Sequence, residues 1–267
     1  MKIQFCKFDG AGNDFVVVDI RDGLQLSEQQ VKAMCHRRFG IGADGLMTLD
    51  SASVYGADFE MKYYNSDGRQ GSMCGNGGRC IVAFAFMLGL GHKDEESGRT
   101  VLSFDGYDGR HKAEIVVWDD ASSMGIVRLS MKDVDCSDVH RCGEGWFLDT
   151  GSPHYVQRVV GLDAFDVVGE GRRLRNRTDL FPEGANIDFV EDGSDGSLRV
   201  RTYERGVEDE TWACGTGVTA AAIVSGNRRV STRGGDFKVE FNATGKSFTN
   251  VWLTGPVSFN FRGEMDV

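Results

Sequence analysis

The chain has 267 residues, which is enough for one large domain or two of ordinary size, each with its own core. Hydrophobic residues make up 40% of the chain and charged residues 26%, as is typical of folded soluble proteins. The formal net charge of -10 disfavours nucleic acid or an anionic membrane as a partner, although a local cluster of donors can still bind an anionic small molecule.

The first residues lack a secretory apolar region, and the longest apolar run, residues 81–88, is too short to span a membrane. We therefore expect a cytoplasmic protein whose seven cysteines, none in a CxxC pair, are free thiols. No metal site is expected, because Cys35-His36 is the nearest approach to a ligand cluster and adjacent residues do not easily face one metal. No cofactor is expected either, since no phosphate loop accompanies a convincing Schiff-base lysine.

Alternating apolar residues predict strands along most of the chain. The expected strands are residues 15–18, 58–64, 113–118, 198–203 and 251–253.

An internal repeat is the most informative feature of the sequence. In the first copy, a strand and turn at residues 61–68 precede Met73-Cys74-Gly75-Asn76-Gly77, an apolar helix-like run at 81–88 and a hairpin from 101–104 to 114–117. In the second copy, residues 201–206 precede Ala213-Cys214-Gly215-Thr216-Gly217, an apolar run at 218–224 ending at Gly226, and a hairpin from 239–241 to 251–253.

Both helices are apolar nearly all round, so each must be enclosed by other elements. We therefore predict an α/β (α+β) fold of two pseudo-symmetric domains, each a curved, mainly antiparallel sheet or barrel around a central helix. The hydrophilic stretch at 119–123 is the expected boundary. It separates an N-terminal domain carrying Cys74 (1–119 plus 257–267) from a C-terminal domain carrying Cys214 (120–256). Pseudo-symmetry would place the two Cys-Gly-x-Gly segments opposite each other across a cleft.

A cysteine at the start of a helix is suited to proton transfer, because free N–H groups and the helix dipole lower a thiol pKa. The glycine-flanked amides would form a cradle for a carboxylate. Two thiols on opposite faces of one α-carbon would supply the base and the acid that cofactor-free racemisation requires. A lone cysteine is more often a small buried hydrophobe, which is our interpretation of Cys6, Cys35, Cys80, Cys136 and Cys142. A redox disulfide between Cys74 and Cys214 is the competing chemistry.

Three segments resemble the motifs of the diaminopimelate epimerase family: Gly-Ala-Gly-Asn-Asp-Phe at 10–15, Met-Cys-Gly-Asn-Gly-Gly-Arg-Cys at 73–80, and Tyr-Glu-Arg-Gly at 203–206 with Ala-Cys-Gly-Thr-Gly at 213–217. They stand in the family's order, and the chain length fits. The resemblance implies cofactor-independent interconversion of LL- and meso-2,6-diaminopimelate by a homodimer, with Cys74 and Cys214 as base and acid. It implies binding of this diamino dicarboxylic acid by Asn13, Asn65, Gly75, Asn76, Asn186, Glu204, Arg205, Gly215 and Thr216. His154 and Glu204 match positions that tune the thiols.

Two positions depart from the family pattern. Ser152 stands where Asn is common, and Gly45 stands where some members carry Gln. Taken alone, Asn13 and Asn65 are also typical turn residues, and Glu204-Arg205 is also typical of a surface ion pair.

Three rival functions remain. A related racemase of proline, hydroxyproline or histidine is disfavoured by Asn65 and the Tyr-Glu-Arg-Gly segment. An isomerase of the phenazine-biosynthesis type is disfavoured by the paired thiols. A non-catalytic amino-acid-binding or redox-sensing protein would be separated from an enzyme by solvent exchange of a substrate α-proton.

Overall fold

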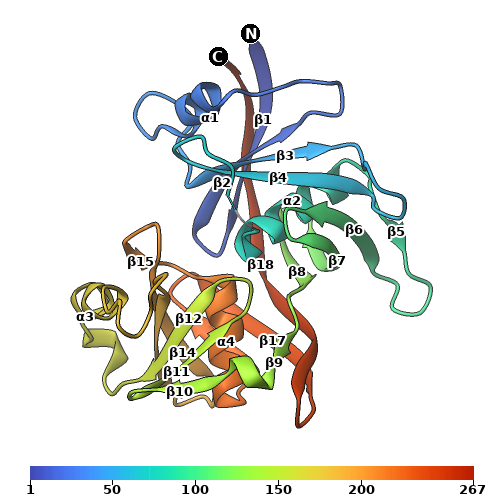
Figure 1. Cartoon of the computed structure of the whole chain (residues 1–267). Coiled ribbons are helices and arrows are strands. Elements are labelled where there is room, and N and C mark those ends of the chain that lie inside the picture. The colour runs from blue at the N-terminus through green and yellow to red at the C-terminus, as the bar shows by residue number, and fades with distance from the viewer. Residues whose placement is uncertain (72) are drawn as a thin grey trace. The chain divides into compact units, whose positions relative to one another are not determined.

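A computed structural model describes residues 1–71 and 73–267, and the chain divides into two compact units (Figure 1). Unit 1 comprises Met1–Leu129 and Gly255–Val267, and unit 2 comprises Ser130–Thr254. One long strand, β18 (Ser247–Asp266), therefore contributes to both units.

The elements of unit 1 before β18 are β1 (Lys2–Gly10), β2 (Asn13–Asp19), α1 (Glu28–Cys35), β3 (Gly45–Asp50), β4 (Phe59–Asn65), α2 (Gly75–Met87), β5 (His92–Lys93), β6 (Thr100–Gly106), β7 (Gly109–Asp119) and β8 (Met124–Ser130). Those of unit 2 are β9 (Val134–Asp135), β10 (His140–Cys142), β11 (Gly145–Asp149), β12 (Pro153–Arg158), α3 (Val167–Arg175), β13 (Asn186–Asp192), β14 (Leu198–Glu204), β15 (Asp209–Thr211), α4 (Gly215–Ser225), β16 (Arg229–Thr232) and β17 (Gly235–Ala243), with short 3₁₀ helices at Cys136–Asp138 and Leu162–Ala164.

The strands of unit 1 close into a barrel. Pairing runs from β18 through β1, β2, β3, β4, β6, β7 and β8 and returns to β18. The β2–β3 and β4–β6 pairs are parallel, and the other pairs in this ring are antiparallel. A closed barrel leaves no sheet edge unpaired along this ring.

Unit 2 repeats the same order of pairings. From β11 to β12, β13, β14, β16, β17 and β18, the strands pair antiparallel, parallel, antiparallel, parallel, antiparallel and antiparallel. This is the sequence of pairings from β1 to β8 in unit 1. The internal repeat in the sequence is therefore a repeat of topology, and the α+β class is confirmed.

The central helix of each unit is enclosed by strands, as predicted (Figure 1). Helix α2 packs against β1, β2, β3, β4 and β7, and residues 75–85 of this helix are buried. Helix α4 packs against β11, β12, β13, β14, β16 and β17. Both helices begin directly after a cysteine. The C-cap of α4 is Gly226, whose φ of 74° is the left-handed conformation that glycine accepts without strain.

Two further helices, α1 and α3, cover the outer faces of the sheets. Strand β2 shows why this is needed, because its apolar run is buried on both faces. Val16 and Val18 belong to a core cluster with Val31 and Met34 of α1, whereas Phe15 faces Gly77 of α2. Neither α1 nor α3 was predicted from the sequence.

The predicted domain boundary at residues 119/120 needs correction. Residues 120–123 form the tight turn between β7 and β8, and β8 pairs with β7 and β18 in unit 1. The compact units therefore divide after Leu129, and β18 re-enters unit 1 at Gly255. No helix of the described residues is both long and apolar enough to cross a membrane.

Candidate active site

Cys74 is the N-cap of α2 in unit 1. Its sulfur accepts a hydrogen bond from the Gly77 N–H at 3.5 Å, and its thiol lies 3.7 Å from Asn13 Oδ1. The thiol is half-buried, and the first turn of the helix contains Gly75, Asn76 and Gly77, all buried. The sulfur therefore lies at the positive end of the helix dipole, beside backbone N–H groups suited to an anion.

The side chain of Asn76 is oriented from beneath by a fully buried arginine. Arg79 donates to Asn76 Oδ1 at 3.0 Å, to the Gly75 carbonyl at 3.1 Å and to the Pro256 carbonyl at 3.3 Å. Asn76 Nδ2 is thereby directed to Asn13 Oδ1, 3.4 Å away. Burial lowers the pKa of Arg79 to about 10, so the guanidinium remains charged at neutral pH.

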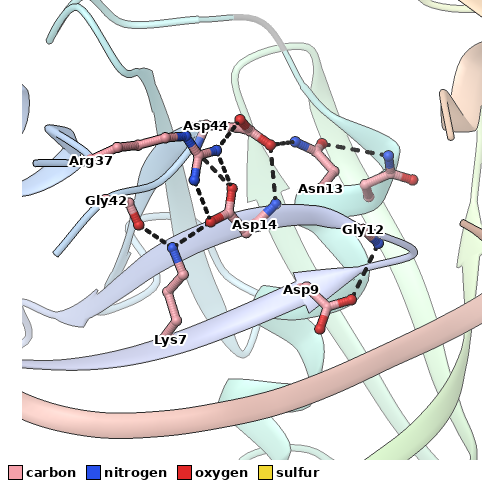
Figure 2. Close-up of polar contacts among 9 residues, drawn as sticks. Lys7, Asp9, Gly12, Asn13, Asp14, Arg37, Gly42 and Asp44 are labelled. Carbon is pink, nitrogen blue, oxygen red and sulfur yellow. Dashed lines mark hydrogen bonds and ion pairs between the residues drawn. The ribbon is translucent and has the colours of Figure 1, made fainter. Parts of the chain in front are cut away.

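A charged network holds Asn13 in place (Figure 2). Asn13 Nδ2 donates to Asp44 Oδ2 at 2.6 Å, and Arg37 bridges Asp44 and Asp14 at 2.5 and 2.7 Å. Lys7, itself buried, donates to Asp14 at 2.7 Å and to the Gly42 carbonyl. Burial alone would raise the pKa of Asp14, but the hydrogen bonds from Arg37 and Lys7 outweigh it and hold that pKa well below its usual range.

Asn65 ends strand β4 opposite Gly45 of β3, and its side chain is exposed. Its backbone accepts from the Gly68 N–H and donates to the Arg69 carbonyl, so it is also a turn residue. A β-carbon on Gly45 would lie 2.5 Å from the Tyr63 ring and 2.6 Å from the Tyr64 carbonyl. The tyrosine ring therefore leaves no room for a larger residue at position 45, which gives a packing reason for this departure.

Cys214 is the N-cap of α4 in unit 2 and is buried. Burial raises the pKa of its thiol well above the ordinary value, and the carboxylates of Glu204 and Asp188 raise it further. The Thr216 hydroxyl, 3.3 Å from the sulfur, and the Gly217 N–H act in the opposite direction but are weaker. Burial and these two carboxylates therefore act against the acidity expected of a thiol at a helix N-terminus.

His154 lies beside this thiol in a buried polar group. Its Nε2 is 2.9 Å from Thr216 Oγ1, and its Nδ1 is 2.7 Å from Asp188 Oδ2. The side chains of His154 and Asp188 are fully buried. Thr202 donates to the other oxygen of Asp188 at 2.7 Å. The structure thus connects His154 to Cys214 through the side chain of Thr216. From the sequence, only the backbone amide of Thr216 was predicted to have a role, in binding the substrate carboxylate.

Asn186 joins this polar group to the segment that carries Arg205. Its Oδ1 accepts from the Arg205 backbone N–H at 2.8 Å, so its Nδ2 faces Ser152 Oγ at 3.2 Å and the Pro153 carbonyl at 3.2 Å. The Arg205 guanidinium donates to the Glu183 carbonyl at 3.1 Å. Glu204 ends β14 and is half-buried.

Ser152 occupies the place in unit 2 that Asn13 occupies in unit 1. Strand registers match Phe15 with Gly45 and His154 with Asn186, so positions 13 and 152 each lie two residues before the matched strand residue. Asn13 contacts Asn76 of α2, and Ser152 contacts Thr216 of α4 at 3.1 Å. The shorter serine therefore keeps a hydrogen bond to its helix.

The predicted site residues thus fall into two sets, one in each unit. Around Cys74 the structure groups Asn13, Gly75 and Asn76, with Asn65 at the end of β4. Around Cys214 it groups His154, Asn186, Gly215 and Thr216, with Glu204 and Arg205 at the end of β14. Sequence reasoning missed Asp44, Arg79, Asp188 and Thr202. A charge within an apolar run, as at Arg79 and Asp188, was the available signal. Within residues 1–71 and 73–267, no group of three His, Cys, Asp or Glu side chains could hold a metal ion.

Solved structures of other proteins share this fold. A probable proline racemase from Agrobacterium radiobacter aligns with a TM-score of 0.68 at 17% identity, covering 99% of this chain and 92% of that one. A phenazine biosynthesis protein from Bacillus anthracis aligns with a TM-score of 0.67 at 16% identity, covering 100% of both chains. Fold and site together define the class: a two-unit α+β protein in which a cysteine is the N-cap residue of the central helix of each unit.

The family within this class follows from sequence comparison. The diaminopimelate epimerase family model matches residues 5–102 and 146–260. Diaminopimelate epimerase of Flavobacterium psychrophilum is 43% identical, covering 97% of this chain and 98% of that protein. The Chlorobaculum tepidum enzyme of the same name is 42% identical, covering 95% and 98%. The chain belongs to the diaminopimelate epimerase family, and it is an isomerase.

Proposed function

We propose that this chain interconverts LL-2,6-diaminopimelate and meso-2,6-diaminopimelate without a cofactor, in lysine and peptidoglycan precursor biosynthesis. The observation that carries the proposal is the cysteine that caps the buried central helix in each unit of a chain of this family. A single reactive thiol would serve many chemistries, but a matched pair suits proton removal and proton return.

In this mechanism one thiolate removes the α-proton, so the Cα–H bond breaks and an S–H bond forms. The other thiol delivers its proton to the opposite face of the carbanion, so its S–H bond breaks and a new Cα–H bond forms. Cys74 and Cys214 exchange these roles when the reaction runs in reverse, and no electrons leave the substrate. The atoms balance without a metal or an oxidant.

Backbone amides at the two helix starts would hold the carboxylate of the reacting centre. Gly75 and Asn76 belong to the first turn of α2, and Gly215 and Thr216 to the first turn of α4. Backbone N–H groups at a helix start and the helix dipole favour negative charge, which increases on the carboxylate as the α-proton departs.

The remaining polar residues would recognise the diamino dicarboxylic acid. Asn13, Asn65 and Asn186 offer amide groups, and the carboxylate of Glu204 is complementary to an ammonium group. The planar guanidinium of Arg205 is suited to bidentate binding of the distal carboxylate. His154 and Glu204 would also tune the thiols.

The test is to incubate the reduced protein with LL-diaminopimelate in deuterated water, beside Cys74→Ala and Cys214→Ala. We expect deuterium at the α-carbon and formation of the meso isomer in the wild type, and loss of epimerisation in both variants. Cys136→Ala is the matched control, because Cys136 lies in a 3₁₀ helix with its thiol directed at the Thr244 carbonyl, 3.8 Å away. Wild-type protein with free thiols that gives no exchange would contradict the substrate assignment, and proline would then be tried.

The proposal extends to a cytoplasmic homodimer, which the family resemblance implies. Sedimentation equilibrium at micromolar concentration would give twice the 29.3 kDa chain mass for a dimer. The mass of a single chain in a preparation with full epimerase activity would contradict the homodimer and leave the proposed reaction unaffected.

A further inference from the structure

A row of hydrogen-bonded side chains leads from Cys214 into the interior of unit 2. Thr216 Oγ1 lies 3.3 Å from the sulfur and 2.9 Å from His154 Nε2. His154 Nδ1 lies 2.7 Å from Asp188 Oδ2, and Thr202 donates to Asp188 Oδ1 at 2.7 Å. The row therefore joins a buried thiol to a fully buried carboxylate through one hydroxyl and one imidazole.

The buried carboxylate determines which ring nitrogen of His154 carries the proton. An ionised Asp188 only accepts hydrogen bonds, so its 2.7 Å contact requires a proton on His154 Nδ1. Nε2 of the neutral ring is then an acceptor, facing the hydroxyl of Thr216. Burying a carboxylate without partners is costly, and the donors on Asp188 from His154 and Thr202 reduce that cost.

In unit 1 the side chains equivalent to His154 and Asp188 are apolar, so the fold does not require this row. A β-carbon on Gly77 would meet Met47 at 2.9 Å and Phe15 at 3.6 Å. A β-carbon on the equivalent Gly217 would meet Asp188 at 2.4 Å and His154 at 3.2 Å.

The cross-strand partners of Met47 and Asp188 also occupy equivalent positions in the two units. Strand pairing sets Met47 opposite Tyr63 and Asp188 opposite Thr202. Where unit 1 has Phe15, Met47 and Tyr63, unit 2 therefore has His154, Asp188 and Thr202. The polar version occurs under Cys214, whose thiol is the buried one of the pair.

We propose that Asp188 is a positioning residue that fixes the His154 ring so that its Nε2 takes up the proton of Cys214 through the Thr216 hydroxyl. This inference rests on the proposed function, in which Cys214 must be the thiolate in one direction of the reaction. The Cys214 S–H bond breaks as an O–H bond forms on Thr216, and the hydroxyl proton of Thr216 passes to Nε2. The products are a thiolate and an imidazolium that the Asp188 carboxylate stabilises, and the reverse transfer restores the thiol.

Other charges also face this row. Glu204 at the end of β14 and Asp188 both disfavour the thiolate of Cys214. Asp149 of β11 interacts with His154 and is paired with Lys132 at 3.0 Å. Neutral partners of the ring are Ser152 at 3.1 Å and Asn186 at 3.3 Å from Nε2. Thr216 is the nearest of these groups to Nε2, and its hydroxyl also contacts the sulfur.

Asp188→Asn tests the proposal, because two explanations of the role of Asp188 predict opposite changes in the rate at which Cys214 reacts with a thiol reagent. If Asp188 only repels the thiolate, its removal makes Cys214 react faster with a thiol reagent at a given pH. If Asp188 stabilises the imidazolium, its removal makes Cys214 react more slowly. The rate then falls by about tenfold for each pKa unit by which the Cys214 thiol becomes less acidic. We expect the slower reaction, measured from pH 6 to pH 10 with methyl methanethiosulfonate on the substrate-free protein and quantified on the tryptic peptide that contains Cys214. A faster reaction would overturn the proposal.

Two companion variants keep this test interpretable. Thr216→Val keeps the shape of the side chain and leaves the His154–Asp188 contact in place, so slower modification of Cys214 is expected here too. Modification at the wild-type rate would overturn the role of the hydroxyl. Asp192→Asn makes the same chemical change on the same strand, at an exposed carboxylate paired with Arg158 at 2.6 Å, and should leave the rate unchanged.

Nitrogen-15 spectra of the histidine rings test the tautomer directly. In the wild type we expect His154 to carry its proton on Nδ1, and in Asp188→Asn we expect a mixture of tautomers. A wild-type ring protonated on Nε2 alone would overturn the assignment. Neither measurement uses a substrate, so failure of diaminopimelate epimerisation and failure of this inference are distinguishable.

Discussion

Asn13 donates its side-chain amide to Asp44 at 2.6 Å (Figure 2). Its carbonyl oxygen is therefore the atom that lies 3.7 Å from the Cys74 thiol. An amide that could rotate freely would present nitrogen or oxygen to the site with similar ease. Asp44 removes this ambiguity, because a carboxylate accepts only from the NH₂ group. The network around Asp44 thus decides which atom of Asn13 the thiol meets.

Asp44→Asn should loosen this orientation, because the new amide can both donate and accept. We expect kcat/KM for epimerisation to fall by about 10- to 100-fold, since small misplacements of positioning groups have effects of this size. Asp9→Asn is the control, on the β1–β2 hairpin that carries Asn13, where the Asp9 carboxylate accepts from the Gly12 N–H at 3.2 Å. Equal kcat/KM values for the two variants would show that the Asp44 contact has no influence on the reaction.

Arg79 anchors Asn76 and the start of α2 from within unit 1 (0% exposed). Arg79→Lys should destabilise the fold by about 2 to 4 kcal/mol, because a single ammonium cannot reproduce a planar fork on three acceptors and leaves buried oxygens unpaired. Urea unfolding would measure the loss. Arg69→Lys, at a side chain that is 80% exposed, should change stability by less than about 0.5 kcal/mol. A loss as small as this at position 79 would contradict the anchoring role.

The repeat and the central helices were predictable because their signals are local. Apolar residues all round a helix require enclosure, and two such helices after matched Cys-Gly-x-Gly segments require two enclosures. Helices α1 and α3 were missed although each has a capping signal: Ser27 with Gln30 forms a capping box, and Asp166 accepts from the Gly169 N–H. Their sequences are short and mostly polar, so periodicity gave little support.

The site was only partly predictable, because the burial of a side chain depends on segments that are distant from it in the sequence. A cysteine at a helix start suggests an acidic thiol, yet the pKa of Cys214 is raised because strands from elsewhere in the sequence exclude water from it. Asp188 and Thr202 lie on different strands and meet only through the register of β13 and β14. Such a contact follows from pairing, which a single sequence does not specify residue by residue.

Cys35 should make the fold sensitive to alkaline pH. Burial raises its pKa from 9.0 to about 12, so the folded protein keeps the thiol protonated where the unfolded chain loses the proton. The stabilisation is therefore complete below pH 9 and is lost as pH rises through the interval from 9 to 12, with about 2 kcal/mol lost by pH 10.5. Cys35→Ala should reduce the difference in unfolding free energy between pH 8 and pH 10.5 by this amount. An unchanged difference would show that Cys35 does not titrate in this way.

Gly77 and Gly217 occupy equivalent places in the repeat but face different neighbours. A β-carbon at position 217 would lie 2.4 Å from Asp188 Oδ1, an atom fixed by its hydrogen bond from Thr202. A β-carbon at position 77 would lie 2.9 Å from Met47 Sδ, which belongs to a flexible, unbranched side chain.

Gly217→Ala should therefore be the more destabilising substitution, by about 1 to 3 kcal/mol relative to Gly77→Ala. Both changes add the same methyl group to the first turn of a buried helix, where alanine gains equally in helix propensity, so each serves as the other's control. Urea unfolding at one pH gives the comparison directly. Equal stabilities would mean that the Asp188 carboxylate moves aside as easily as the Met47 thioether. That result would contradict the conclusion that Thr202 holds the Asp188 carboxylate in a fixed position beside α4.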